Sequence, residues 1–290
     1  MKSDTGKSDS GNPDDGEPIE RAHLKHPNDT THTIFRYPAA PDLGDVVRRY
    51  WIPVWRVPPG RDAPQQVLRY PVCLVVITED YARFYGVESG LSTTVLTGEG
   101  WAAGVMLTPA AGALVAGGPL PSFTDRIVEV PEVLGDAGVH VVEQVREVMR
   151  RDPRSPDAHR AAMGIYDEAF RRYLPVDDEG RLVNRVVAFV EDNPDVLRVE
   201  QVRNEFGLSE RALQRLVHRR IGLTPKWLIQ RRRLQEAAGR LREKSGSLSE
   251  VAAVLGYADQ PHFVRDFKNA VGVTPGAFAD RYAPDRPPQG

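Results

Sequence analysis

Arginine and glutamine side chains gather on one face of each of two short predicted helices near the C-terminal end of the chain. In the first helix, Arg211 and Arg215 are four residues apart and share a face, with Gln214 beside them. In the second, Gln260 and Arg265 lie opposite an apolar pair. Arginine can bond guanine O6 and N7, and glutamine can bond adenine N6 and N7. Side chains of these types can contact base edges in DNA, and the alternative is a solvated helix face.

The same short pattern precedes both helices. A short predicted helix ends at a glycine, Gly207 or Gly256, which adopts the left-handed conformation at little cost. An apolar residue and then an N-cap follow, Ser209 in the first copy and Asp259 in the second, whose side chains accept from free backbone N–H groups. The repeat predicts two helix-turn-helix units, in each of which the second helix can enter a major groove.

A longer helix is predicted between the two units. Thr224 caps it, Pro225 occupies its first turn, and it runs to about Arg242. Roughly 20 residues at about 1.5 Å each give a rod of about 30 Å, close to the roughly 34 Å between successive major grooves on one face of DNA. Successive helical residues point in different directions, so residues 231–233, all arginine, cannot all face DNA; at least one is expected to pair with Glu236 or Asp266.

This region resembles the DNA-binding domain of the AraC/XylS transcriptional regulators. Residues 256–268 and 272–278 are close to the signature of that family, and residues 208–216 and 222–225 resemble its first unit. The resemblance extends from about Leu182 to Tyr282, a third of the chain. It implies an all-α domain that binds double-stranded DNA.

The resemblance also implies roles for individual residues on the two recognition helices. Val264 can contact a thymine methyl group, and Pro261 is given no contact because it departs from the polar residue often seen there. The residues expected to read bases are Arg211, Gln214, Arg215, Gln260, Val264 and Arg265, and those expected at phosphates are Ser209, His218, Lys226, Arg231 and Lys268.

Charge is unevenly distributed along the chain. The 290 residues carry a net charge of −2, but residues 181–283 hold 18 Lys and Arg against 12 Asp and Glu, a net of +6. Residues 31–180 hold 15 against 20, a net of −5. A basic C-terminal half fits a nucleic-acid module joined to another domain. Without an apolar stretch of about 18 residues or a secretory signal, we expect a cytoplasmic protein that has no contact with membranes.

The N-terminal half predicts short strands. Apolar runs divided by turn residues, such as 50–57, 72–77 and 101–107, predict a small, partly open, cupin-like β-barrel. Two helices follow, and they either pack on the barrel, cover it as a lid or form a dimer contact. The predicted fold is therefore α+β and multidomain, divided into a disordered tail (1–30), a β-rich sensor domain (31–136), a helical connector or dimerisation segment (137–176), the DNA-binding domain (180–283) and a C-terminal tail (284–290).

Residues 68–73, 104–109 and 120–126 resemble an uncharacterised domain found in front of many AraC-type regulators. That resemblance implies no particular ligand. No histidine lies between Thr33 and His140, so the histidine and glutamate cluster of metal-binding cupins is missing, and neither a metal nor a cofactor is expected.

Three functions remain open from the sequence. The first is a transcription regulator, with a small-molecule effector, a homodimer partner and RNA polymerase as further candidates for partners. The second is a repair-like enzyme attached to a DNA-binding module, which needs a reactive thiolate. Cys73 is the single cysteine and lies in an apolar run, where a thiol is usually inert, so we expect no enzyme. The third is an N-terminal domain that only dimerises.

Overall fold

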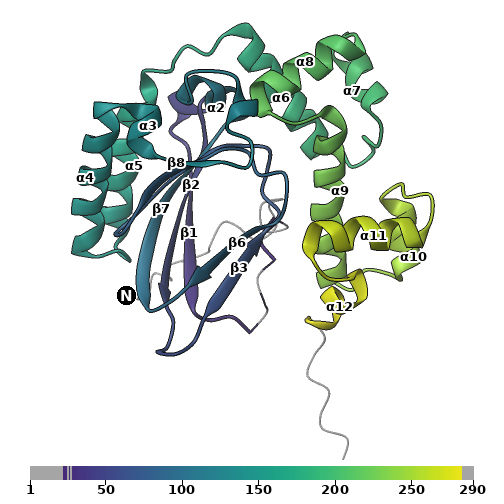
Figure 1. Cartoon of the computed structure of the whole chain (residues 1–290), viewed down its shortest axis with the longest axis horizontal. Coiled ribbons are helices and arrows are strands. Elements are labelled where there is room, and N and C mark those ends of the chain that lie inside the picture. Colours follow the sequence, from purple (N-terminus) through teal and green to yellow (C-terminus); the bar gives the residue numbers. More distant parts are fainter. Residues whose placement is uncertain (1–21, 25, 27, 283–290) are drawn as a thin grey trace, which may run out of the picture.

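The computed structural model describes residues 22–24, 26 and 28–282, which form an N-terminal β-sheet domain and a C-terminal helical domain (Figure 1). Inward-facing Val75, Ile77 and Val105 are fully buried and form the centre of the main sheet. The mixed α+β architecture expected from the sequence is confirmed. The main sheet has six antiparallel strands in the spatial order β1 (His32–Pro38), β2 (Val47–Arg56), β7 (Glu99–Leu107), β4 (Leu74–Thr78), β5 (Ala82–Tyr85) and β8 (Ile127–Glu129).

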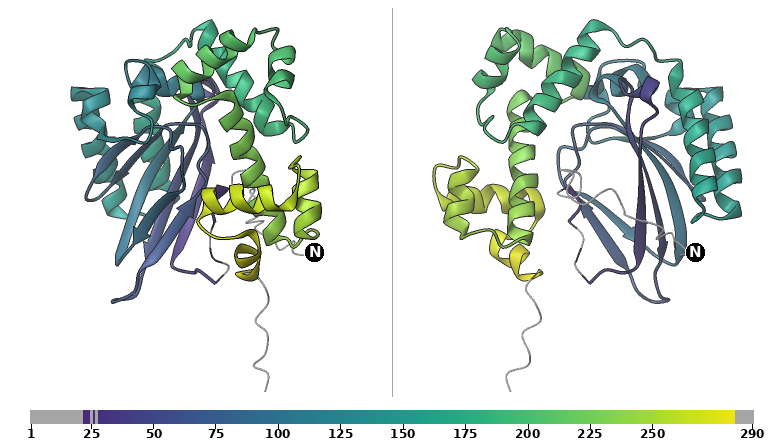
Figure 2. Two further views of the ribbon diagram at one scale, coloured as in Figure 1. Left: turned by 45° about the vertical axis from the view of Figure 1, so that its right-hand side comes forward. Right: turned by 180° about the vertical axis from the view of Figure 1, so that it is seen from behind.

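Two further strands form a separate ribbon. Strand β3 (Ala63–Val67) pairs with β6 (Ser92–Leu96) in antiparallel register. Among the described residues, the ribbon is extended only by an isolated bridge between His23 and Val67. It lies across from the main sheet, as the view from behind in Figure 2 shows. The predicted β-domain is thus present, as a six-stranded sheet and a separate two-stranded ribbon.

The predicted helical pair packs on the main sheet. Helices α4 (Asp136–Arg151) and α5 (Pro156–Arg171) lie side by side at one side of the sheet (Figure 1). The fully buried Tyr166 hydroxyl donates to the carbonyl oxygen of Ala103 at 2.8 Å, which ties α5 to β7. Of the alternatives left open by the sequence, the structure shows packing on the β-domain. A dimer contact on the outer face of the pair remains a prediction.

A short helix that was not predicted from the sequence lies between the two domains, and its small residues allow close packing there. Helix α2 (Pro109–Val115) starts at the cap Thr108, and its Ala110 and Ala111 are fully buried. The backbone N–H of Ala110 donates to Asn184 Oδ1 at 2.8 Å, which ties α2 to the helical domain. A Cβ on Gly112 would approach Cys73 Sγ to 2.8 Å, so only glycine fits there. The connecting segments η1 (Pro41–Leu43), η2 (Leu120–Ser122) and α3 (Val130–Leu134) complete this domain.

The helical domain begins and ends its helices where the sequence places caps. The side chains of Ser209, Thr224 and Asp259 each accept a hydrogen bond from a backbone N–H in the first helical turn. Gly222 and Gly272 end two helices with φ of 86° and 84°, the left-handed region that glycine adopts without strain. The helices are α6 (Asp178–Asp192), α7 (Val199–Glu205), α8 (Glu210–Ile221), α9 (Pro225–Arg242), α10 (Leu248–Val254), α11 (Gln260–Val271) and α12 (Pro275–Asp280).

In the part of the chain that the structure describes, no helix combines the length and apolarity needed to span a bilayer. The predictions of a disordered tail at residues 1–30 and a second tail at 284–290 fall largely outside the described residues.

Candidate nucleic-acid interface

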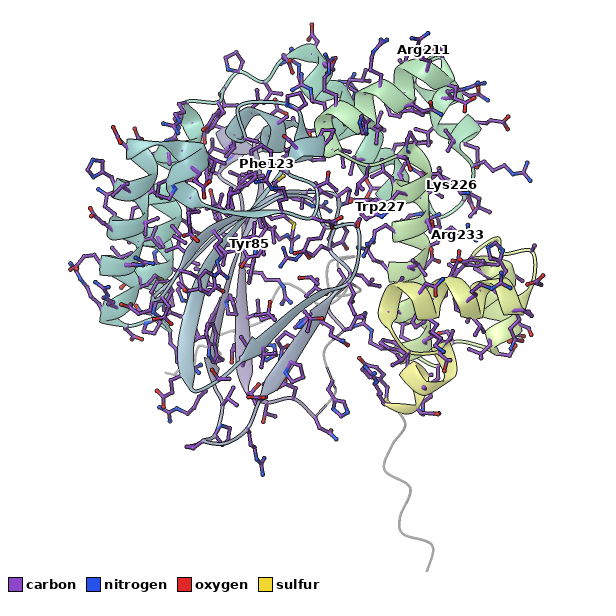
Figure 3. The ribbon with its side chains drawn as sticks, in the orientation of Figure 1. Tyr85, Phe123, Arg211, Lys226, Trp227 and Arg233 are labelled. Atoms are coloured by element: carbon purple, nitrogen blue, oxygen red, sulfur yellow. The ribbon has the colours of Figure 1, made fainter. Side chains whose placement is uncertain are left out.

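The first predicted recognition helix is α8. Gly207, with φ of 61°, turns the chain after α7, and Ser209 Oγ accepts from the N–H of Ala212 at 3.2 Å. Leu213 and Val217 are fully buried and attach α8 to the domain core. The opposite side of the helix is exposed and carries the predicted base-reading residues Arg211, Gln214 and Arg215. Figure 3 shows Arg211 pointing into solvent at the outer end of the domain.

The second predicted recognition helix is α11. Asp259 Oδ1 accepts from the N–H of His262 at 2.7 Å, which fixes the start of the helix. Phe263 and Phe267 are fully buried, with ring centroids 5.8 Å apart, so this side of α11 faces the core. The predicted base-reading residues lie on the remaining sides: Arg265 is exposed, whereas Val264 and Gln260 are half-buried.

Gln260 has a partner within its own unit. Its Oε1 accepts from Ser249 Oγ at 2.6 Å. The contact connects α10 to the first residue of α11, and it leaves the amide nitrogen of Gln260 as the group available to an adenine N7 or a phosphate.

Four of the five predicted phosphate-contacting residues are exposed. Ser209, His218, Lys226 and Lys268 all lie at the surface of the helical domain. Lys226 projects from the start of α9, where Figure 3 shows it on the outer side of the helix.

The burial of Arg231 contradicts the phosphate contact predicted for it. Its side chain is only 4% exposed and points into the N-terminal domain, where its Nη2 donates to the carbonyl oxygens of Ser89 and Gly90 at 2.5 and 3.0 Å. The guanidinium also lies 4.6 Å from the centre of the Trp227 ring. Burial lowers the pKa of Arg231 to about 10, which still leaves it cationic at neutral pH. Arg231 therefore binds backbone carbonyls of its own chain, not phosphate.

The other two arginines of the run are also engaged within the protein. Arg232 is 6% exposed and pairs with Glu236 at 3.0 Å, which confirms the expected ion pair within this helix. The Arg233 guanidinium lies 3.9 Å from the centre of the Tyr257 ring. Arg232 Nη2 also donates to the carbonyl oxygen of Val196 at 2.9 Å, so residues 231–233 hold α9 to three different neighbours.

The N-terminal domain binds α9 along its length, a contact that was not predicted from the sequence. Trp227 Nε1 donates to the carbonyl oxygen of Ser89 at 3.2 Å, and Gln235 Nε2 donates to that of Leu68 at 2.7 Å. Leu68 is fully buried in the core of the second helix-turn-helix unit. The acceptors are backbone carbonyls more than 130 residues away, so no local sequence pattern could indicate them.

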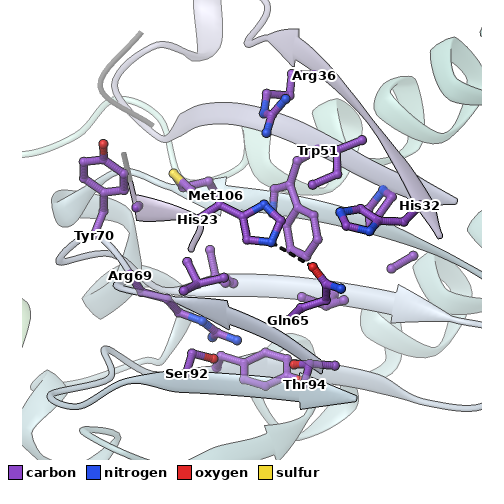
Figure 4. A pocket seen from close by; sticks show the side chains of 18 of the residues that line it. His23, His32, Arg36, Trp51, Gln65, Arg69, Tyr70, Ser92, Thr94 and Met106 are labelled. Carbon is purple, nitrogen blue, oxygen red and sulfur yellow. Dashed lines mark hydrogen bonds between the residues drawn. The ribbon is translucent and has the colours of Figure 1, made fainter. Parts of the chain in front are cut away.

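The N-terminal domain contains a separate candidate site, a cavity of about 180 Å³ between the main sheet and the β3–β6 ribbon (Figure 4). Its walls are mainly apolar and aromatic. His23 Nε2 and Gln65 Oε1 are 3.0 Å apart at one side, and Arg69 reaches into it from the end of β3.

Neither an activated thiol nor a metal cluster accompanies this cavity in the described part of the chain. Cys73 is fully buried, and burial raises the pKa of its thiol to about 12, so it is not a nucleophile near neutral pH. Residues 22–24, 26 and 28–282 contain no group of three or more His, Cys, Asp or Glu that could hold a metal ion.

Comparison with known proteins assigns both parts of the chain. Residues 203–281 match the family described as a helix-turn-helix domain, and residues 35–129 match a domain of unknown function, DUF6597. The transcriptional activator RhaS of Escherichia fergusonii is 33% identical over 94 residues, which cover 32% of this chain and 34% of RhaS. The Escherichia coli O1:K1 protein of the same name is 30% identical over 101 residues, covering 34% and 36%. The chain thus spans about a third of the length of these relatives.

Solved structures with some likeness include a probable AraC family transcriptional regulator from Rhodopseudomonas palustris. It is 25% identical, covers 36% of this chain and 99% of its own, and has a TM-score of 0.33. ToxT of Vibrio cholerae is 11% identical over 90% of this chain and 100% of its own, with a TM-score of 0.41. The capped recognition helices, the matched helix-turn-helix family and the RhaS relatives together identify the C-terminal part of this chain as an AraC/XylS-type double helix-turn-helix domain, which follows a DUF6597 domain.

Proposed function

We propose that this protein is a sequence-specific, DNA-binding transcription regulator that reads two successive major grooves. The observation that carries the proposal is the placement of two capped recognition helices at either end of α9. With 18 residues at about 1.5 Å each, α9 is roughly 27 Å long. That length brings two recognition helices near the roughly 34 Å repeat of the major groove.

The exposed faces of the recognition helices supply the base contacts in this proposal. Arg211, Gln214 and Arg215 read one groove, and Gln260, Val264 and Arg265 read the next. The arginines offer paired donors to guanine O6 and N7, the Gln260 amide nitrogen offers a donor to adenine N7, and Val264 offers an apolar contact to thymine.

Phosphate contacts come from Ser209, His218, Lys226 and Lys268 in the proposal. We leave Arg231 out because its guanidinium is buried against the Ser89 and Gly90 carbonyls. The DNA-binding domain begins at about residue 177 rather than 180, since Asp177 caps α6 and pairs with Arg220, and it ends near Tyr282.

Control by a small molecule at the N-terminal domain is the second part of the proposal. The cavity between the sheets supports it, because apolar cavities with a few polar groups are the usual form of ligand sites. RNA polymerase and a second copy of the chain remain candidate partners. The site of action is the cytoplasm, where a bacterial chromosome is read. The buried thiol of Cys73 argues against the enzyme alternative.

The test is selection of bound sequences from a random pool of DNA duplexes, followed by gel shifts with the full chain. We expect a recovered site with two half-sites about one helical turn apart. Arg211→Ala should lose preference in one half-site and Arg265→Ala in the other. Arg154→Ala, an exposed arginine in the turn between α4 and α5, serves as the control and should change neither. Recovery of no consensus, or of a single short half-site that both variants affect, would refute the two-groove proposal.

A further inference from the structure

The cavity of the N-terminal domain is shaped by aromatic side chains. Trp51, which Figure 4 shows, lines it together with Trp55, Tyr81 and Tyr85, all from the main sheet and its loops. Its described lining residues include no aspartate or glutamate, whereas Arg69 is one of the cationic side chains that line it. The interior therefore suits an apolar body that carries a negative charge.

Two glycines on β7 make room for this aromatic lining. Gly104 is opposite Trp51 in the β2–β7 register, and Gly100 is opposite Trp55. A Cβ at Gly104 would lie 2.3 Å from Trp51 Cε2, and one at Gly100 would lie 2.4 Å from Trp55 Cζ2. Both indole rings thus lie directly on the strand. Trp51 Nε1 is buried and has no hydrogen-bond partner among the described residues, which leaves a donor for an occupant of the cavity.

Arg69 is the charged group best placed to hold an anion. Its Nε lies 3.3 Å from Glu88 Oε2, and its guanidinium lies 4.8 Å from the centre of the Tyr85 ring. The Arg69 Nη1 atom is buried without a hydrogen-bond partner in the described part of the chain. A buried cationic donor left unpaired is costly, and an entering carboxylate would satisfy it.

The two members of the Arg69–Glu88 pair are each next in sequence to a residue that binds α9. Leu68, before Arg69, accepts from Gln235 at 2.7 Å. Ser89, after Glu88, accepts from Arg231 at 2.5 Å. A ligand that takes Arg69 away from Glu88 therefore acts on both chain segments that hold the helix between the two recognition helices.

We infer that the cavity binds an apolar organic carboxylate, that the carboxylate pairs with Arg69 in competition with Glu88, and that this exchange alters how the N-terminal domain holds α9. The inference rests on the proposed control of DNA binding by the N-terminal domain. Size sets a further limit: at about 10–15 Å³ for each water-sized group, 180 Å³ accommodates roughly 12–18 such groups. Bicyclic aromatic acids and medium-chain fatty acids are of this size.

The outer rim of the cavity is acidic and bears on how fast a carboxylate enters. A neighbouring hollow shares Arg69 and Tyr85 with the cavity and is lined by the exposed Glu79 and Glu99. Salt screens exposed carboxylates but screens the half-buried Arg69 less. The rim is therefore expected to slow association at low salt and to affect affinity less.

The binding test uses the full chain and isothermal titration calorimetry without DNA. The probes are 1-naphthoic acid and decanoic acid, with 1-naphthamide as a neutral analogue of nearly the same shape. We expect an acid to bind at least tenfold more tightly than the amide. Equal binding of naphthoic acid and naphthamide, or no binding of either acid at millimolar concentration, overturns the inference.

Variants separate a direct anion contact from a structural role. Arg69→Gln should abolish the preference for acid over amide, and Arg69→Lys should retain part of it. Glu88→Gln removes the competing carboxylate, so the acid should bind several-fold more tightly, a gain that mere loss of structure cannot produce. Arg154→Gln changes an exposed arginine in the turn between α4 and α5, outside the cavity and its rim, and should have no effect. Weaker acid binding by Glu88→Gln contradicts the competition.

A second measurement tests transmission to α9. DNA affinity on a selected site is compared with and without saturating acid, in the wild-type chain and in Arg69→Gln. We expect a change of at least threefold in the wild type and none in the variant. If the acid binds but DNA affinity stays constant, transmission to α9 is wrong. If the protein binds no DNA at all, the proposed function fails while the calorimetry still decides the ligand.

Discussion

The paired variants Arg265→Ala and Phe267→Ala test whether α11 reads DNA with one side while the other side holds it in the domain. The Phe267 side chain is fully buried, and its ring centroid lies 5.8 Å from that of Phe263 and 5.5 Å from that of Phe278. Truncation of such a phenylalanine leaves a cavity and typically costs about 3–5 kcal/mol. We expect a value in the upper half of that range, because two aromatic contacts are lost together.

Arg265 gives the opposite expectation. Its side chain is exposed, and no hydrogen bond or ion pair joins it to another described residue. Its truncation should change the free energy of unfolding by less than about 0.5 kcal/mol. Loss of a bidentate contact with guanine should cost about 1–3 kcal/mol of specific binding, which is roughly a 5- to 140-fold change in Kd. Binding to unrelated DNA should change much less.

Denaturant melts and titrations on a selected duplex and a scrambled duplex provide the measurements. Phe267→Ala should lower the midpoint of unfolding first and lose DNA binding as a consequence. The assignment of Arg265 is refuted if Arg265→Ala unfolds the domain, which makes the residue structural. It is equally refuted if affinity falls by the same factor on both duplexes, which makes the residue a phosphate contact.

Three further predictions concern phosphate contacts, acid stability and the cavity. If the protein neutralises about 4–8 phosphates, a plot of log binding constant against log salt concentration should have a slope of roughly −4 to −7. Lys226→Ala should reduce the magnitude of this slope by about 0.9, whereas Arg231→Ala should leave it unchanged. A changed slope with Arg231→Ala would mean that Arg231 contacts a phosphate after all. Although burial opposes ionisation, hydrogen bonds from Thr31 and Gln65 lower the pKa of Asp29 to about 2. The stability that the ionised Asp29 contributes is therefore present above about pH 4 and is lost as pH falls toward 2. Acid titrations monitored by circular dichroism should show a smaller loss of stability over this window in Asp29→Asn than in the wild type, and an identical loss would contradict the assignment. Gly104→Ala should displace Trp51, lower the free energy of unfolding by about 1–3 kcal/mol through overpacking and abolish binding of naphthoic acid. Gly44→Ala is the control, because a Cβ there meets nothing within 4 Å.

The helix-turn-helix units could be predicted because their signals are local. Ser209, Thr224 and Asp259 cap the helices that follow them in the sequence, and the phenylalanine pair on α11 has the spacing of a buried face. Capping and i, i+4 packing involve residues within one or two turns of each other, so a single sequence contains the evidence for them.

Strand β1 and helix α2 could not be predicted for the opposite reason. Strand β1 is at the edge of the sheet and most of its residues are half-buried, so it lacks a clear alternation of apolar and polar residues. Helix α2 is short and rich in alanine and glycine, and it is stabilised by contacts such as that of Ala110 with Asn184, 74 residues later. Tertiary contacts, rather than local preference, determine both elements.

Arg231 shows the same limit within the candidate site. A run of three arginines near a recognition helix indicates phosphate contacts as long as the surroundings of the helix are unknown. In the structure, 12 of the 18 residues of α9 are buried, so the helix is a core element of the whole molecule instead of an exposed rod. The acceptors of Arg231 come from the turn between β5 and β6, and sequence patterns around α9 contain no information about that turn.

This burial gives α9 two tasks that depend on each other. Its ends set the separation and orientation of α8 and α11, while its middle donates hydrogen bonds to the N-terminal domain through Arg231 and Gln235. A helix is stiff over 18 residues, so a shift of the carbonyl acceptors at Leu68 and Ser89 moves α9 as a unit, and both helix-turn-helix units with it. Such a movement changes the position of both recognition helices relative to the N-terminal domain, and with it the access of DNA to them. Control of DNA binding from the N-terminal domain therefore requires no direct contact between a ligand and either recognition helix.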